Sequence, residues 1–155
     1  MAPAADPAPL GLAAFALTTF LLSAANAGWM TKATGDAWLG FAFACGGVAQ
    51  LLAGMWEFRN RNVSGATAFG TYGSFWIGAG AVGPPGRPHP QEQDRWWWRR
   101  MRRRRLRSGT IKFGGYIGIL TALVAWYASA AGVANGMRGT PLRPVGKPFA
   151  MGSTA

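Results

Sequence analysis

Asp6-Pro7-Ala8-Pro9-Leu10-Gly11-Leu12 runs directly into an uncharged segment that ends near Trp29. Residues 10–27 are a run of 18 without a formal charge. A helix of about 20 apolar residues crosses a hydrocarbon core about 30 Å thick. The stretch therefore predicts a Pro-rich motif that leads into a first transmembrane helix.

Three more uncharged runs follow, at residues 38–56, 66–82 and 113–133, and they are 19, 17 and 21 residues long. The charged stretch 57–62 between the first two of these runs is typical of an aqueous loop, and the 17-residue run is at the short limit for a span. We therefore predict an all-α integral membrane protein, multi-pass, with a bundle of four transmembrane helices. The sequence does not say which membrane it occupies.

The net charge of +11 is concentrated in one segment. Ten of the sixteen Lys and Arg lie in residues 84–112, among Trp and Pro residues. We divide the chain into residues 1–83 with three helices, a basic low-complexity segment at 84–110 that we expect to be disordered, and residues 111–155 with the last helix and a tail. Such an Arg/Trp/Pro-rich insert can bind anionic lipid or, less favourably, nucleic acid, so a membrane-anchored adaptor is the alternative function.

The first run has a second interpretation, a cleaved signal peptide. Ala25-Asn26-Ala27 fits a small-x-small cleavage site after an apolar run. Asp6 is the only formally charged side chain ahead of the run, so the basic n-region of a signal peptide is lacking. Retention as a helix is the favoured interpretation.

Enzyme chemistry has little support in the sequence. The single His is His89 in a Pro-rich stretch, the single Cys is Cys45 in an apolar run, and no carboxylates are paired at helical spacing. We predict no catalytic residue, no metal site and no cofactor.

Polar and aromatic residues inside the spans are the candidate site residues, because polar groups in a membrane need internal partners. Helical spacing puts Phe15 and Asn26 on one stripe of the first span and Gln50 on a small-residue face with Gly46 and Glu57. In the third span it puts Tyr72 on a stripe with Phe69 and Trp76, beside Ser74. Packing or helix–helix hydrogen bonds explain each of these as well as a substrate path does.

Three motifs carry a resemblance to a known family. Residues 6–12 match the opening Asn-Pro-Ala-Pro-Leu-Gly-Leu of the acetate and succinate permeases in six of seven positions, with Asp6 in place of Asn. Gly46-Gly47-Val48-Ala49-Gln50 and residues 72–76 match that family's second and third helices. The chain therefore resembles this family, whose members have six helices and assemble as hexamers. The resemblance implies that Phe15 and Tyr72 lie at a central constriction and that Gln50, Asn26 and Ser74 are polar contacts.

The same resemblance implies a function: a permease for acetate and related small monocarboxylates, with succinate as a further substrate, linked to protons and working as a homo-oligomer in the lipid bilayer. In it residues 6–12, namely Asp6, Pro7, Ala8, Pro9, Leu10, Gly11 and Leu12, shape the cytoplasmic mouth, where the Asp6 carboxylate would repel an anion. The family's fourth and fifth helices have no counterpart, and residues 84–110 stand in their place. An out-of-frame or mis-spliced reading of GC-rich coding sequence would produce such a segment. The lack of two helices would leave the chain as written inactive.

Overall fold

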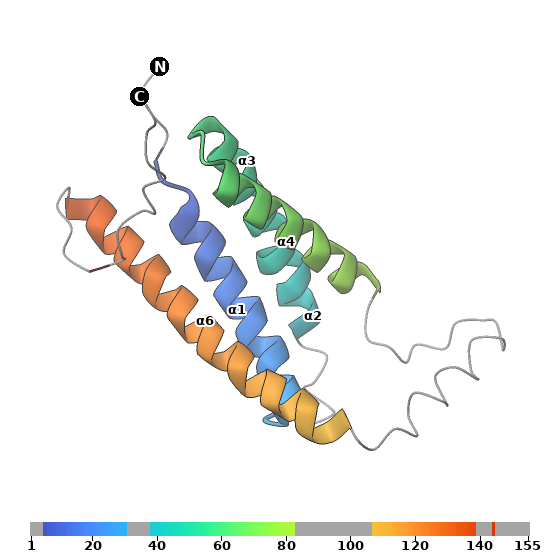
Figure 1. Cartoon of the computed structure of the whole chain (residues 1–155). Coiled ribbons are helices and arrows are strands. Elements are labelled where there is room, and N and C mark those ends of the chain that lie inside the picture. The colour runs from blue at the N-terminus through green and yellow to red at the C-terminus, as the bar shows by residue number, and fades with distance from the viewer. Residues whose placement is uncertain (1–4, 31–37, 83–106, 139–143, 145–155) are drawn as a thin grey trace, which may run out of the picture.

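The computed structural model of the chain describes residues 5–30, 38–82, 107–138 and 144, and it is helical throughout these ranges apart from turns (Figure 1). The elements are α1 (Ala8–Ala27), α2 (Trp38–Phe41), the π-helix η1 (Ala42–Ala49), α3 (Gln50–Arg59), α4 (Val63–Val82) and α6 (Arg107–Arg138). The segments α2, η1 and α3 follow one another without a break and form one rod.

The ends of α1 follow from local chemistry. Pro9 lies in the first turn, where its missing N–H costs no hydrogen bond. The Asp6 carboxylate accepts a hydrogen bond from the backbone N–H of Ala8 at 3.0 Å. At the other end Gly28 takes a left-handed conformation with φ 86°, and its N–H bonds to the last carbonyls of the helix.

Close contacts at glycines fix how the helices pack. A Cβ on Gly54 would lie 2.8 Å from the backbone N of Gly70, so α3 and α4 touch backbone to backbone in antiparallel directions. A Cβ on Gly115 would lie 2.7 Å from the backbone N of Ala27, which brings the start of α6 against the end of α1. Small residues permit this approach, which is the usual basis of helix association in membranes.

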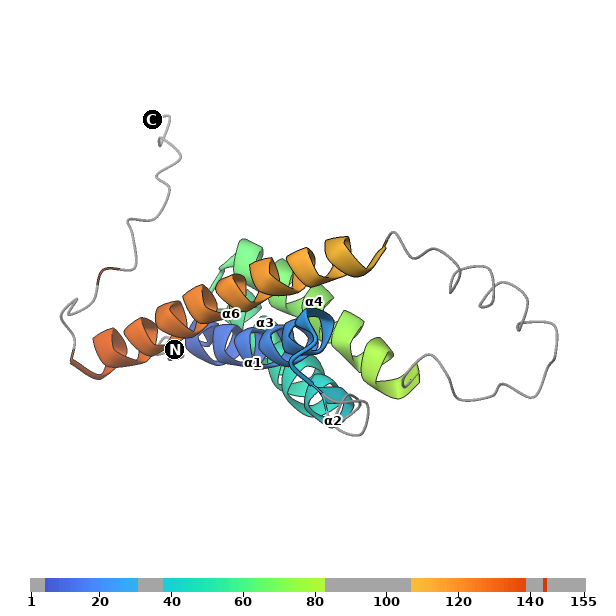
Figure 2. The same ribbon diagram turned by 90° about the horizontal axis from the view of Figure 1, so that it is seen from below.

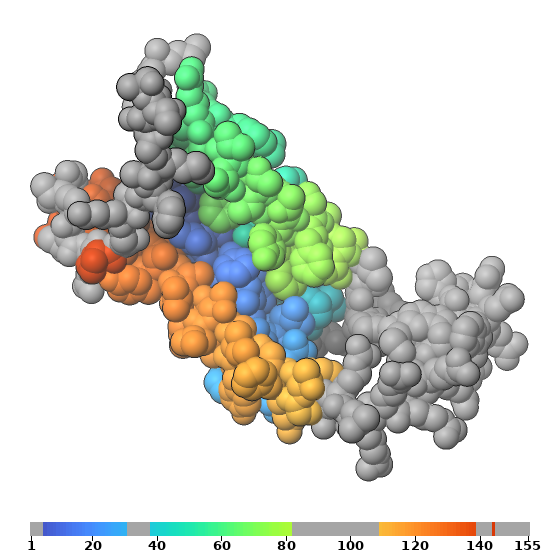
Figure 3. Space-filling model, viewed as in Figure 1, coloured from blue at the N-terminus to red at the C-terminus, as the bar shows by residue number. Residues whose placement is uncertain are grey.

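Helix α1 is the centre of the bundle. It lies between α6 on one side and the α2–η1–α3 rod on the other, and α4 packs mainly against that rod (Figure 2). Among the described elements, α6 contacts α1 alone. Part of the surface of α1 is consequently visible between α4 and α6 (Figure 3).

The predicted fold class is confirmed, with one difference in the spans. Ala8–Ala27, Trp38–Arg59 and Gly109–Arg138 are long and apolar enough to cross a membrane. Helix α4 is 20 residues long but is not among these candidate spans, because hydroxyl residues and glycines dilute its apolar content. The fourth span therefore stays a prediction.

The boundaries of α6 differ from the predicted ones at both ends. The helix continues to Arg138, beyond the uncharged run that ends at Val133, and it includes Asn135 and Gly136. It begins at Arg107, which lies within the segment 84–110 that we expected to be disordered. Residues 84–106 of that segment lie outside the described residues.

Candidate functional site

The structure brings Phe15 and Tyr72 together. Their ring centroids are 5.4 Å apart with an interplanar angle of 73°, an edge-to-face contact between α1 and α4. Tyr72 is 49% exposed and Phe15 is half-buried, so this aromatic pair lies at the edge of the bundle rather than in its core. Among the predicted substrate-path residues Phe15, Tyr72, Gln50, Asn26 and Ser74, this is the pair for which the structure records a direct contact.

Gln50 lies in the core, one helical turn after Gly46. The small-residue face predicted for this helix is confirmed, because Gly46, Gln50, Ala53, Gly54 and Glu57 are all buried. The wider i→i+5 turns of η1 end where Gln50 begins α3, and π-helical segments occur frequently at functional sites. The side chain of Gln50 is only 1% exposed, and its Oε1 has no hydrogen-bond partner among the described residues.

Trp76 faces the same part of the rod. A Cβ on Gly46 would lie 2.8 Å from Cγ of Trp76 and 2.7 Å from Cγ2 of Thr18, so α1, η1 and α4 meet here. Trp76 is 4% exposed, and its indole Nε1 has no hydrogen-bond partner within the described part of the chain. Sequence periodicity placed Trp76 on one stripe with Phe69 and Tyr72. The structure buries Phe69 and Trp76 and leaves Tyr72 half-exposed.

Among the described residues, the structure records no contact between Asn26 or Ser74 and the aromatic pair. Asn26 is exposed in the last turn of α1, about 16 Å along the helix axis from Phe15 at 1.5 Å per residue. The described helices therefore do not enclose its amide, and its role in a substrate path stays a prediction. Ser74 is exposed, and its hydroxyl donates to the carbonyl of Gly70 at 2.9 Å, a bond within its own helix.

The motif at residues 6–12 makes contacts with two helices and a turn. Gly11 packs under the ring of Phe69, whose atoms would lie 2.7 Å from a Cβ at this position. The carbonyl of Pro9 accepts a hydrogen bond from the Ser129 hydroxyl at 2.7 Å. Ala5, just before the motif, accepts a bond from the Asn60 amide at 3.4 Å. The motif thus ties α1 to α4, to α6 and to the α3–α4 turn.

Sequence reasoning missed the role of Ser129. The signal was present, because Ser129 lies in a run of small residues, Ala128-Ser129-Ala130-Ala131-Gly132, that suits a close helix contact. A Cβ on Gly132 would lie 2.9 Å from the ring of Pro9, which confirms how closely the two helices approach.

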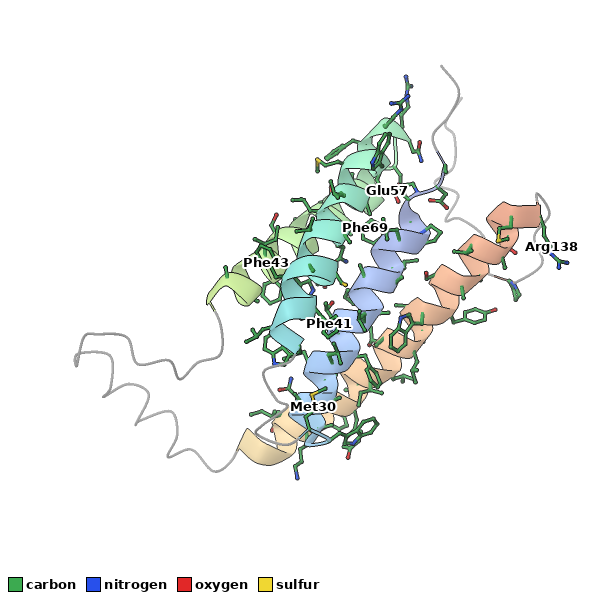
Figure 4. All side chains as sticks on the ribbon, turned by 180° about the vertical axis from the view of Figure 1, so that it is seen from behind. Met30, Phe41, Phe43, Glu57, Phe69 and Arg138 are labelled. Carbon is green, nitrogen blue, oxygen red and sulfur yellow. The ribbon has the colours of Figure 1, made fainter. Side chains whose placement is uncertain are left out.

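Glu57 is a second buried polar side chain, at the end of the bundle where α3 turns into α4 (Figure 4). It is 1% exposed, and its Oε1 has no hydrogen-bond partner among the residues that the structure describes. Gly65 makes room for it, since a Cβ there would lie 2.9 Å from Cδ of Glu57. The carboxyl group therefore lies beside the first turn of α4.

Within the described ranges, no group of three or more His, Cys, Asp or Glu could hold a metal ion. His89 lies outside those ranges. Cys45 is half-buried with a free thiol.

A family model described as the GPR1/FUN34/yaaH family matches residues 2–88, which include α1 to α4. Over 82 residues the chain is 52% identical to acetate permease A of Emericella nidulans, a match that covers 53% of this chain and 28% of that protein. Over 73 residues it is 45% identical to the succinate-acetate/proton symporter SatP of Escherichia coli K12, covering 47% of this chain and 38% of SatP. The chain thus matches well under half the length of these relatives.

The solved structure of the bacterial acetate channel SatP resembles the fold of the chain. The TM-score is 0.72 at 27% sequence identity, and the alignment covers 92% of this chain and 99% of the channel. The resemblance to the acetate and succinate permeases is confirmed by these matches. Together with the three apolar helical segments, they identify the chain as a multi-pass integral membrane protein.

Proposed function

The chain belongs to the GPR1/FUN34/yaaH family, and from this premise we propose that it is a permease for acetate and related small monocarboxylates. The matched residues include both members of the aromatic pair, Phe15 and Tyr72. The names of the relatives, an acetate permease and a succinate-acetate/proton symporter, support this substrate class and make succinate a further candidate.

The aromatic pair is the observation that carries the proposal. An edge-to-face contact between α1 and α4 presents two apolar ring surfaces and one phenolic hydroxyl at the edge of the bundle. Apolar walls exclude large hydrated ions, and a hydroxyl can orient a carboxyl group. In the proposed path Tyr72 and Phe15 form the narrowest part, and Gln50, Asn26 and Ser74 remain candidate polar contacts.

Proton linkage follows from the cost of charge in an apolar passage. A carboxylate stripped of water is strongly disfavoured in a low-dielectric region, whereas the neutral acid enters at much lower cost. We therefore propose that the acid crosses the aromatic pair together with its proton. A homo-oligomer, a hexamer by resemblance, is part of the same proposal.

The Asp6 carboxylate does not prevent this role. Its oxygen accepts the Ala8 N–H at the start of α1, where the helix dipole partly offsets its negative charge. The motif at residues 6–12 thereby stabilises the helix that carries Phe15. The alternative adaptor function rests on residues 84–106, which lie outside the described residues, and no structural observation favours it.

The test is uptake of labelled acetate into proteoliposomes that contain the full chain, with an inward proton gradient. Tyr72→Ala widens the constriction, so the preference for acetate over butyrate should fall by roughly 10-fold, the discrimination that one or two methylene groups in an apolar pocket give. Tyr72→Phe keeps the ring and should retain most of that preference.

Tyr127→Ala is the matched control. Tyr127 is 47% exposed on α6, nearly the same as Tyr72, and its hydroxyl bonds to the carbonyl of Pro144. Substitution there should leave the preference for acetate unchanged. Equal selectivity in the Tyr72→Ala variant and the unmodified chain would remove the aromatic pair from the path.

A further inference from the structure

Two buried polar atoms of opposite character are left without partners in the core. Gln50 Oε1 is a hydrogen-bond acceptor and Trp76 Nε1 is a donor, and neither has a partner among the described residues. The two side chains are 1% and 4% exposed. Buried polar groups are paired in the great majority of cases, with other protein groups, with ligands or with ordered water. Each atom therefore calls for a ligand.

Both side chains lie at the junction of the same three helices. Gly46 lies against Trp76 and Thr18. A Cβ on Gly73 would lie 2.7 Å from the backbone N of Leu51, so α4 and the rod are also in close contact there. Gln50 is one turn after Gly46 on the same buried face, and it directly precedes Leu51, whose backbone lies against Gly73 of α4. The two unpartnered side chains thus come from facing turns of the rod and α4.

The Thr18 hydroxyl, a polar group at the same junction, already has hydrogen-bond partners of its own. The Thr18 hydroxyl donates to the carbonyls of Ala14 and Phe15, at 3.0 and 3.2 Å. The remaining ring contacts of Trp76 are with Trp38 and Phe75, which are apolar. The described side chains around the junction therefore offer Gln50 and Trp76 no alternative partner.

We propose that Gln50 and Trp76 form a binding site for an undissociated small carboxylic acid. The acid hydroxyl donates to Gln50 Oε1, and the acid carbonyl oxygen accepts from the Trp76 indole N–H. A carboxylate anion has no proton to give to Gln50, so this buried polar pair selects the neutral form. Water, which is also both donor and acceptor, occupies the site when no acid is present.

The site has a place in the proposed path, and in this respect the inference rests on the proposed function. Trp76 is one turn beyond Tyr72 on α4, and Thr18 is one turn beyond Phe15 on α1, so the junction lies next to the aromatic pair. An acid that has crossed the aromatic pair would then form hydrogen bonds with Gln50 and Trp76 in its neutral form.

The test measures binding without transport. The full chain in detergent micelles, labelled with ¹⁵N at tryptophan, is titrated with acetic acid at about pH 4.5 and at about pH 7.5, on either side of ordinary carboxyl ionisation. The indole N–H resonance of Trp76, identified by its absence in Trp76→Phe, should shift with added acid at the lower pH only. The resonance of Trp126, which packs against Phe20, is the control and should stay in place.

Two variants probe the separate hydrogen bonds. Trp76→Phe keeps an aromatic ring but removes the donor, and Gln50→Leu keeps much of the shape but removes the acceptor. Each should weaken binding of acetic acid at low pH by roughly 5- to 10-fold, the size of one hydrogen bond, while Trp126→Phe should not.

The outcomes separate the site from the transport proposal. If the Trp76 resonance does not shift with added acid, or if binding is tighter at the higher pH, the proposed acid-binding site is wrong. The junction would then hold water alone. This measurement uses the unmodified chain, so it stands even where a variant fails to fold. Acid binding at Trp76 combined with no acetate uptake would overturn the transport proposal and leave the binding site intact.

Discussion

The Ser129 hydroxyl shows how one residue links two helices that are distant in sequence. It donates to the Pro9 carbonyl at 2.7 Å, and Ser129 is 7% exposed. The Pro9 carbonyl lies in the first turn of α1, so this hydrogen bond holds the start of that helix against α6. Interhelical hydrogen bonds in membrane proteins contribute about 0.6 kcal/mol on average, with values up to about 1.7.

We predict that Ser129→Ala lowers the free energy of unfolding in detergent by about 1 kcal/mol, because the Pro9 carbonyl loses its donor. Ser74→Ala is the control. Ser74 is exposed and bonds within its own helix, to Gly70, so the change there should be close to zero. Denaturant titration followed by circular dichroism measures both. If both variants lose the same free energy of unfolding, the interhelical hydrogen bond contributes no more to stability than a bond within one helix.

At the scale of elements, α6 depends on α1 for its place in the described part of the bundle. Two neighbouring glycines at the start of α6 differ in what surrounds them. A Cβ on Gly115 would lie 2.7 Å from the backbone N of Ala27 and 2.8 Å from the carbonyl of Ser23, whereas a Cβ on Gly114 meets nothing within 4 Å.

Gly115→Leu should therefore separate α6 from α1, since backbone atoms cannot move aside as a side chain can. We expect a loss of stability of at least about 1–3 kcal/mol, the usual cost of overpacking. Gly114→Leu adds the same side chain on the open face and should leave stability nearly unchanged. Protease susceptibility of the connection between α4 and α6, together with thermal unfolding, distinguishes the variants, and a tolerant Gly115→Leu would contradict the observed packing.

The outer faces of two helices are chemically different. On α6 the exposed side chains are large and apolar and include Ile117, Leu120, Leu123 and Val124. On α4 the exposed positions are mixed: small hydroxyl residues at Thr67, Thr71 and Ser74 alternate with the large side chains of Tyr72 and Phe75. The α6 face is suited to lipid tails. The α4 face is suited to protein contact or to water, which explains why α4 alone among the long helices falls short as an apolar span.

For the whole molecule, the helix directions determine which ends share a side of the membrane. The Asn60 amide bonds to Ala5, and Ser129 near the end of α6 bonds to Pro9, so the N-terminal motif, the α3–α4 turn and Arg138 lie at one end. A Cβ on Gly28 would lie 3.9 Å from Cε of Lys112, which puts Lys112 at the opposite end. The family resemblance implies a cytoplasmic mouth at residues 6–12, so the end with Arg59, Arg61 and Arg138 is expected to be cytoplasmic. The positive-inside rule agrees for these three residues, but the ten Lys and Arg of residues 84–112 favour the opposite end, so no orientation satisfies all of the positive charge.

Cysteine labelling tests this topology. In a Cys45→Ala background, Arg61→Cys and Arg138→Cys should react with a membrane-impermeant maleimide from the same side, and Lys112→Cys from the other. Oriented vesicles, intact and permeabilised, give the measurement. Labelling of positions 112 and 138 from one side would be incompatible with α6 as a span.

Three of the four predicted spans could be identified from the sequence alone, because the length and polarity of a helix that must cross lipid are local properties. The sequence also identified Phe15 and Tyr72 through a resemblance, and their ring contact agrees with it. The tertiary structure decided which polar residues matter together. Helical spacing assigned Asn26 and Gln50 equal weight, yet Asn26 is exposed at a helix end and Gln50 is buried against α1 and α4. Burial depends on which helix packs against a side chain, and that contact joins residues far apart in the chain.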